Sequence, residues 1–176
     1  GAVLRHAPEW IQDDRVIVLA AVQQDSEALA YASSRLKNDL EVVMAAVKRD
    51  GFSVRFAGRK IRYEDRNVAL AAVRQYGRSL VWLGPFSNDQ EVVLAAVHSD
   101  AWSLKFASPE LAMDWHIIMA AVLNDPLALK LAARVLHNNP QSVEAKRVAL
   151  AAVTRDARAL HYAPEWLRMD LQVVVA

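Results

Sequence analysis

The sequence predicts an all-α fold, an α-helical solenoid (superhelix) of short two-helix repeats, and three observations predict it. One triplet, Ala-Ala-Val, recurs at a nearly constant interval; an Asp opens most of the apolar runs that contain it; and a turn-forming pair of residues follows each run. A sequence pattern that recurs at a fixed short period is typical of repeat proteins, which commonly present a binding surface. The triplets lie at residues 20–22, 45–47, 71–73, 95–97, 120–122 and 151–153, at intervals of 25, 26, 24, 25 and 31 residues.

Composition limits the class of protein. The chain has 176 residues, of which 54% are hydrophobic and 23% charged, so it has enough apolar material for a buried core. Its longest apolar stretches are about six residues, too short to cross a bilayer, so we expect a soluble protein without a membrane span. Cysteine is absent, which removes disulfides and thiolate chemistry but leaves the compartment open. We expect the cytoplasm, with secretion as an effector as the alternative.

The interval divides the chain into units, which we place near residues 1–13 (partial), 14–38, 39–64, 65–88, 89–113, 114–144 (with an insertion), 145–169 and 170–176 (partial). An Asp opens most units and stands just before an apolar run. Its carboxylate can accept hydrogen bonds from the free amides of the first helical turn, so we interpret each one as a helix N-cap. A catalytic or metal-binding role is the competing interpretation. The residues are Asp14, Asp39, Asp65, Asp89, Asp114 and Asp170.

The first helix of a unit is predicted to span roughly residues 89–98 and the equivalent positions elsewhere. Six consecutive apolar residues pass around the whole circumference of a helix, so neighbouring units must cover it. The alanine pairs and the preceding Asp favour a helix over a buried strand. Small alanine side chains let helix axes approach closely, and replacing Ala95 or Ala96 by Leu is therefore predicted to disrupt the stack.

A corner and a second, shorter helical segment follow. Pairs such as Asp50-Gly51 and Asp125-Pro126 mark the corner, where Asp is again expected to be a cap. The second segment is short enough to be one or two turns, partly 3₁₀. A leucine or valine and an aromatic residue two positions later are expected to fill the groove between successive first helices, although an aromatic column can also be a platform for stacking a ligand. The aromatic positions are Tyr31, Phe56, Trp82, Phe106 and Tyr162, with Leu131 in the remaining unit.

The units depart from the template in two places. Six additional residues lie around 137–142, and Ala145 occupies the position of the opening Asp, so we expect a kink or protruding loop and a longer helix starting near Ser142. Residues 4–13 and 170–176 correspond to half units, whose open faces would expose apolar surface. We therefore expect the chain to be part of a longer repeat protein, or packed against one.

The template resembles a known family. The pattern Asp-x-Glu-Val-Val-Leu-Ala-Ala-Val, then x-x-Asp-Gly/Ala, then x-x-Leu-x-x-Ala-Ser, then Leu-x-x-Asp, is similar to a family of short α-helical repeats of unknown function found in bacterial and protist proteins. The resemblance covers essentially the whole chain and implies no activity. The layout also looks like that of leucine-rich variant repeats, in which an α-helix alternates with a shorter or 3₁₀ helix.

Charge is unevenly distributed although the net charge is only +1. Residues 48–78 carry nine basic side chains and three acidic ones. A basic stripe of this size can hold phosphates or an acidic protein surface, and it can equally be a solvated face. The candidate anion-binding residues are Arg55, Arg59, Lys60, Arg62 and Arg66.

Aromatic residues outside the packing pattern are candidates for binding a protein partner, since exposed Trp is enriched at interfaces. We select Phe52 and Trp102, just after the corner, and Trp115, at the start of a first helix. Two matching Ala-Pro-Glu-Trp segments place Trp10 and Trp166 where they can cover the loop between units or anchor a partner.

Residue patterns for catalysis or metal binding are scarce. The five histidines have no helical pairing, no serine lies in a Gly-x-Ser-x-Gly motif, and five glycines are too few for a phosphate-binding loop. We expect no enzyme activity, no metal and no cofactor, while a pair of carboxylates remains the open catalytic alternative. The predicted function is a protein–protein interaction scaffold or recruitment module. The alternative is a module that binds nucleic acid or anionic phosphate ligands through residues 48–78, and a third possibility is a recruiting arm for an enzyme elsewhere in a longer protein.

Overall fold

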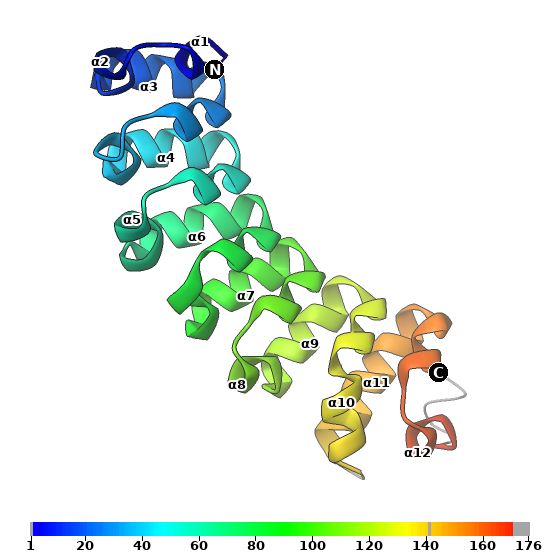
Figure 1. Ribbon diagram of the computed structural model, residues 1–176. Coiled ribbons are helices and arrows are strands. Elements are labelled where there is room, and N and C mark those ends of the chain that lie inside the picture. Colours follow the sequence, from blue (N-terminus) through cyan, green and yellow to red (C-terminus); the bar gives the residue numbers. More distant parts are fainter. Residues whose placement is uncertain (1, 141, 171–176) are drawn as a thin grey trace.

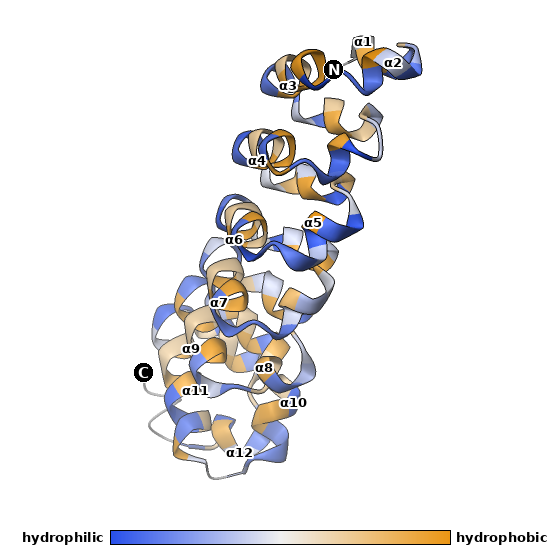
Figure 2. Ribbon diagram, turned by 90° about the vertical axis from the view of Figure 1, so that its left-hand side faces the viewer, coloured by the Kyte–Doolittle hydropathy of each residue, from blue (hydrophilic) through white to orange (hydrophobic). Residues whose placement is uncertain are grey.

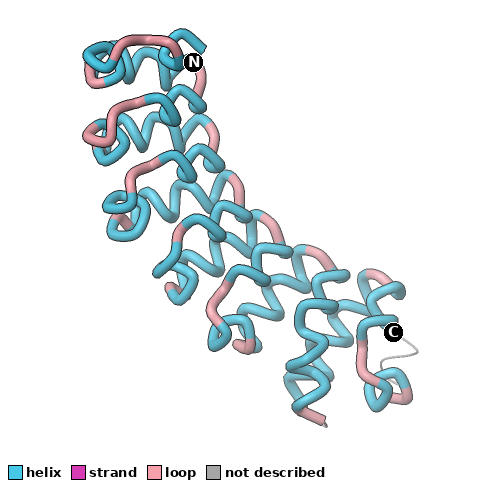
Figure 3. The backbone as a smooth tube through the Cα atoms, viewed as in Figure 1, coloured by secondary structure: helices cyan, strands magenta, loops and turns pink. Residues whose placement is uncertain are grey.

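The described residues form a succession of helices. The computed structural model describes residues 2–140 and 142–170; 81% of these residues are helical and none lies in a strand (Figure 3). The predicted all-α class is confirmed.

Six α-helices form one row. Each contacts the helix before and after it in the row, and Figure 1 shows them side by side in chain order from the N-terminus to the C-terminus. The order of stacking therefore follows the order of the sequence. They are α3 (Arg15–Gln24), α4 (Leu40–Arg49), α6 (Arg66–Gln75), α7 (Gln90–Ser99), α9 (Trp115–Asn124) and α11 (Val143–Arg155).

Short 3₁₀ helices form a second row behind the first. Each of them packs against the α-helix of its own unit, and those before the last also pack against the α-helix of the next unit. This pattern confirms the predicted alternation of a longer and a shorter helix. The second row comprises η1 (Ser26–Tyr31), η3 (Gly51–Phe56), η4 (Gly77–Trp82), η6 (Ala101–Phe106), η7 (Pro126–Ala128) and η8 (Ala157–Tyr162).

Short helical segments connect the 3₁₀ helices from η1 to η7 to the next α-helix of the row, while two others precede α3 and one follows η8. Some are α-helical and some are 3₁₀, which the sequence template did not predict. They are α1 (Ala2–Arg5), α2 (Glu9–Gln12), η2 (Leu36–Asn38), α5 (Arg59–Glu64), η5 (Gly84–Asn88), α8 (Pro109–Ala112), α10 (Leu129–Asn138) and α12 (Glu165–Arg168).

The aspartates act as caps, as predicted. Asp14 accepts hydrogen bonds from the backbone amides of Val16 and Ile17, at 2.9 and 3.1 Å, and the opening aspartates of α4, α6, α7 and α9 cap those helices in the same way. At the corners, an extended Asp ends the α-helix and its carboxylate caps the 3₁₀ helix. Tyr76 replaces Asp at one corner, where the Gly77 amide donates to Ser99 Oγ at 3.1 Å instead. The helix that Asp170 is expected to cap lies outside the described residues.

The core lies between the two rows. Figure 2 shows the α-helices with their hydrophobic side turned toward the second row. The second Ala and the Val of each triplet are buried in every α-helix from α4 to α11, whereas the first Ala is half-buried. The leucine position of the 3₁₀ helices is buried in most units, but the aromatic position beside it is only half-buried and Trp82 is 40% exposed. The predicted core role of this aromatic column therefore holds only in part, because each ring lies at the edge of the groove.

The additional residues in the sixth unit are mostly helical. α10 has ten residues where the other connecting segments have three to six, and α11 has thirteen where the other row helices have ten. Ser142 caps α11 by accepting a hydrogen bond from the amide of Ala145, so the predicted longer helix is confirmed. The expected kink or loop falls between α10 and α11, and residue 141 within it lies outside the described residues.

Candidate interaction surface

Two of the three aromatic candidates connect neighbouring units. Phe52 meets the ring of Tyr76 edge-on, with 5.4 Å between the ring centroids, and Trp102 Nε1 donates to Asp125 Oδ2 at 2.7 Å. In each pair the partner is the corner residue of the following unit. Both side chains are half-buried, so Phe52 and Trp102 are placed as links within the array.

The third candidate, Trp115, occupies a helix position that carries an arginine in two other helices of the row. At the first position of their helices, Arg15 binds Asp39 and Glu41 of the next helix, and Arg66 binds Asp89 and Glu91. Trp115 occupies this position in α9. Counting back from the Ala-Ala-Val triplet of α11, the position of those glutamates carries Arg147 and the position of the capping Asp carries Ala145. The ion pair joins α3 to α4 and α6 to α7, whereas α9 and α11 carry a tryptophan and an arginine at the two positions.

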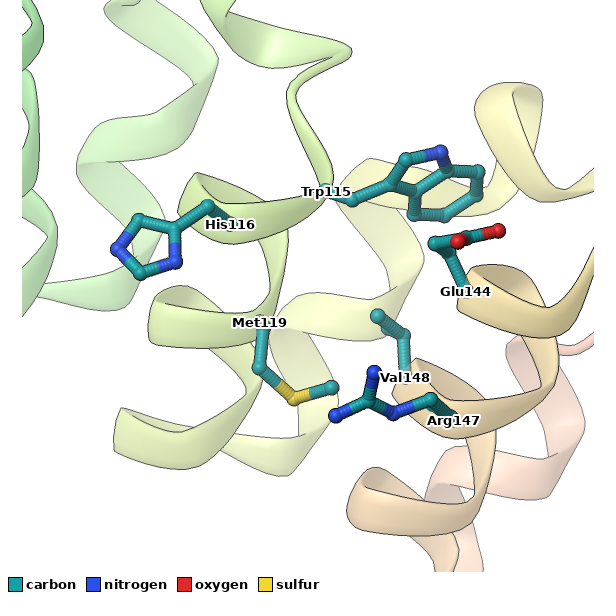
Figure 4. Close-up of a pocket in the computed structure, with 6 residues that line it drawn as sticks. All are labelled: Trp115, His116, Met119, Glu144, Arg147 and Val148. Atoms are coloured by element: carbon teal, nitrogen blue, oxygen red, sulfur yellow. The ribbon is translucent and has the colours of Figure 1, made fainter.

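Clefts lie on both sides of the Trp115 indole. One, of about 520 Å³, lies between α8 and α10. The other, of about 220 Å³, lies between α9 and α11, and Figure 4 shows Trp115 and Met119 of α9 facing Arg147 and Val148 of α11 across it. A third cleft of about 400 Å³ lies between α7 and α9 and shares His116 and Met119 with the second. The three hollows therefore form a series that crosses three successive helices of the row.

The walls of this series are mainly apolar and carry two arginines. Met113 is 56% exposed and borders the largest of these three clefts together with Leu131 and Val135. Arg134 lines the same cleft and Arg147 lines the next one, and neither has an ion pair within the described part of the chain. An apolar hollow with a few polar groups at its edge is the usual form of a binding site.

Glu144 is the acidic side chain among the residues that line these clefts. Its carboxylate accepts a hydrogen bond from Ser142 Oγ at 2.9 Å. The pKa of Glu144 lies below its usual value, first because its own backbone amide donates to it, then because of Ser142, with a smaller contribution from the charge of Arg147. It is therefore ionised at neutral pH and satisfied mainly by its own turn of the helix.

The five basic candidates are divided by the structure. Arg55 lies between the rings of Phe52 and Phe56, at 4.1 and 4.4 Å from their centroids, and pairs with Glu27 at 3.2 Å. Arg62 donates to the backbone carbonyl of Arg55 at 3.2 Å. Arg66, in the first turn of α6, pairs with Asp89 and Glu91, away from these contacts.

Two other candidates in this segment remain exposed. Arg59 lies 5.5 Å from the centroid of Tyr63 and Lys60 points from the same helix, and no ion pair involves either of them in the described residues. Arg74 and Arg78, by contrast, pair with Glu91 and Asp100. The basic stripe predicted for residues 48–78 is thus partly neutralised by its neighbours.

The matching Ala-Pro-Glu-Trp segments differ in exposure. Trp10 is 70% exposed, whereas Trp166 is half-buried against the core. Covering a loop between units therefore describes Trp166 better than Trp10.

Sequence reasoning missed Met113, Arg134 and Arg147. A signal for Arg147 was present, because this residue stands where α4 and α7 carry Glu, but its meaning depends on the register of the lengthened α11. Arg134 follows no repeating pattern, since α10 has no counterpart of the same length in the other units. Met113 ends the connecting segment α8, as Met169 ends α12.

The fold defines an all-α protein made of a repeated pair of helices. The chain belongs to the family described as a domain of unknown function (DUF4116), which matches residues 1–35, 17–62 and 89–134. The predicted membership of a short α-helical repeat family of unknown function is thereby confirmed. No curated protein and no solved structure was found to match the chain.

Two further searches of the described residues bear on function. None of their helices is both long enough and apolar enough to span a bilayer. They also contain no group of three or more histidine, aspartate or glutamate side chains arranged to hold a metal ion.

Proposed function

We propose that the chain is a helical solenoid that serves as a protein-interaction scaffold, with the clefts around Trp115 as the contact area. The observation that carries the proposal is the series of three clefts, which crosses α7, α9 and α11. Arrays of stacked helices present long surfaces to their partners, and buried aromatic and arginine side chains contribute most to such contacts.

Binding is favoured over catalysis because the carboxylates are occupied. The aspartates at the helix starts and corners accept backbone hydrogen bonds, and several of them also pair with arginine. A general acid or base needs a carboxylate that is free to exchange a proton with a substrate. We therefore propose a role without enzyme activity for this chain.

Quantitative affinity capture tests the scaffold. The chain is immobilised, and the proteins that it retains are compared with those that the Trp115→Ala and Trp10→Ala variants retain. Trp10→Ala is the control, because Trp10 is exposed and lies outside the three clefts around Trp115. We expect a defined set of proteins whose retention falls at least tenfold with Trp115→Ala and is unchanged with Trp10→Ala. Equal losses with both variants, or no set retained above a blank matrix, would contradict the proposal.

A second candidate function rests on Arg59 and Lys60, which are exposed and have no ion pair in the described residues. With Arg62 on the same helix, they can bind phosphate groups of a nucleic acid or another anion. This candidate predicts that a labelled single-stranded oligonucleotide binds with an affinity that falls steeply with salt. It also predicts loss of binding when Arg59, Lys60 and Arg62 are replaced by Glu. A salt-independent signal would eliminate it.

A further inference from the structure

The cleft series has the shape of a track for a linear ligand. Trp115 borders both the cleft between α8 and α10 and the cleft between α9 and α11. His116 and Met119 then border both this cleft and the one between α7 and α9. A compact small molecule would fill one hollow, whereas an extended segment of a polypeptide can place successive side chains in adjacent ones.

The charged side chains along the three clefts indicate which charge the ligand carries. Arg134 and Arg147 lie in neighbouring clefts without an ion pair in the described residues, while Glu144 is satisfied by Ser142 and its own amide. An arginine beside an apolar wall forms strong, two-pronged hydrogen bonds with a carboxylate that reaches it. The complementary ligand therefore carries acidic groups next to apolar side chains.

The apolar walls of these clefts favour a peptide ligand over a nucleic acid. Met113, Leu131 and Val135 line the largest of the three clefts and Met119 and Val148 line the next, with Trp115 as the shared aromatic residue. Proteins that bind single strands combine several aromatic platforms with a continuous basic groove. One indole between apolar walls, with one arginine in each of two clefts, fits apolar side chains better than bases.

We propose that these clefts bind a short linear protein segment in which one or more acidic residues neighbour apolar ones. The apolar side chains occupy the hollows on either side of Trp115, and the carboxylates reach Arg134 and Arg147. This inference rests on the proposed scaffold function and specifies the chemistry of its partner.

Selection from a phage library of random dodecapeptides tests the inference. Peptides are selected on the wild-type chain, and the dominant sequence is synthesised with a fluorescein label for anisotropy titration. We expect enrichment of sequences with Asp or Glu within a few positions of Leu, Ile, Met, Phe or Trp. Arg134→Glu and Arg147→Glu, each at an exposed side chain, should weaken the peptide at least tenfold and leave the thermal midpoint unchanged. The matched control, Arg59→Glu, should change neither.

The outcomes separate this inference from the scaffold function. Enriched peptides that need Trp115 but carry no acidic preference would overturn the inference and leave the scaffold function standing. No enrichment would overturn the inference, whereas the scaffold function is decided by the capture experiment. Binding of a labelled single-stranded oligonucleotide that depends on Trp115 and Arg147 would overturn the inference in favour of a nucleic-acid ligand. A selection on the Arg134→Glu/Arg147→Glu chain that shifts toward Lys-rich and Arg-rich peptides would support it.

Discussion

Glycine allows two neighbouring units to approach closely at the start of their 3₁₀ helices. A Cβ atom on Gly77 would lie 2.3 Å from the carbonyl oxygen of Ala96 and 2.7 Å from Ser103 Oγ. A Cβ on Gly51 would meet the carbonyl oxygen of Ala72 in the same way, at 2.3 Å. Ser79 Oγ donates to the Gly51 carbonyl at 3.0 Å, so a small residue and a serine hydroxyl meet across the junction.

Gly77→Ala is predicted to destabilise the chain. The new methyl group collides with backbone as well as with Ser103, so the units must move apart, at a cost of about 1–3 kcal/mol as in other overpacked sites. Urea denaturation measures the change. The control is Ala101→Gly at the equivalent position, which should cost only about 0.5–1 kcal/mol through backbone entropy. A Gly77→Ala variant that is more stable than wild type, as when alanine fits its site, would show that this close approach does not exist.

Asp89 combines a helix cap with an ion pair. Its carboxylate accepts from the Val92 amide at 3.1 Å and from Arg66 Nε at 2.6 Å. The hydrogen bond from Arg66 is the main cause that lowers the pKa of Asp89 below its usual value, while partial burial opposes it. Because the folded-state pKa is lowered, the associated stability is present above the unfolded value near 3.9 and is lost as the pH falls through the folded value.

Replacing Arg66 by Gln is therefore predicted to have a pH-dependent effect. At pH 7 the variant should be less stable, and the difference should shrink as the pH falls toward 2, because protonation of Asp89 removes its ion pair with Arg66. Thermal midpoints measured from pH 2 to 7 report the change. Arg59→Gln, which removes no ion pair, should follow the wild-type curve. A difference that persists unchanged at pH 2 would mean that Arg66 acts through packing instead.

At the scale of the element, the α-helices of the row are placed by their alanines. Ala96 of α7 is fully buried, whereas Ala95 on the same helix is half-buried. The sequence pattern treats the two alanines alike, and the structure distinguishes them.

Enlarging the buried alanine is predicted to disrupt the row. Ala96→Leu adds three carbon atoms where no space exists, which should cost about 1–3 kcal/mol or more, while Ala95→Leu should cost less than about 1 kcal/mol because part of the side chain can reach solvent. Thermal denaturation followed by circular dichroism compares the two. Equal destabilisation by both substitutions would contradict the assignment of Ala96 to the contact between helices.

The alternation of helices was predictable because each unit carries its own signals. The capping Asp, the six apolar residues and the corner pair act locally, and they recur often enough to be read by superposition of units. Connecting segments such as α5 and η5 were not predictable, because three to six residues adopt an α or a 3₁₀ turn according to what they pack against.

The candidate site was predictable only in part. Trp115 was selected from the sequence as a tryptophan outside the packing pattern, and the structure places it between two clefts. Phe52 and Trp102 were selected by the same rule, yet their partners, Tyr76 and Asp125, lie more than twenty residues further along the chain. Burial of a side chain at a junction depends on the following unit, which a pattern within one unit does not contain.

At the scale of the whole molecule, stability depends on the place of a unit in the row. α3 has one neighbour in the row, α4, whereas α9 lies between α7 and α11. The consequence is visible at one equivalent position in two helices, because Ile17 is 40% exposed and Ile117 is fully buried. In a stacked array, the free energy of unfolding is approximately a sum of contributions from units and from junctions between them. The same residue type should therefore contribute less to this free energy where a junction is missing.

The pair Ile17→Ala and Ile117→Ala measures this difference with the chemistry held constant. Ile117→Ala leaves a cavity between α9 and its neighbours and should cost about 2–5 kcal/mol. Ile17→Ala removes a side chain that already contacts solvent and should cost about 1 kcal/mol. Urea denaturation gives the totals, and hydrogen exchange locates the change, with faster exchange spreading through α9 and its neighbours for Ile117→Ala and confined to α3 and η1 for Ile17→Ala. Equal costs, or exchange that rises across the whole chain in both variants, would show that the molecule unfolds as a single cooperative unit rather than as a row of coupled ones.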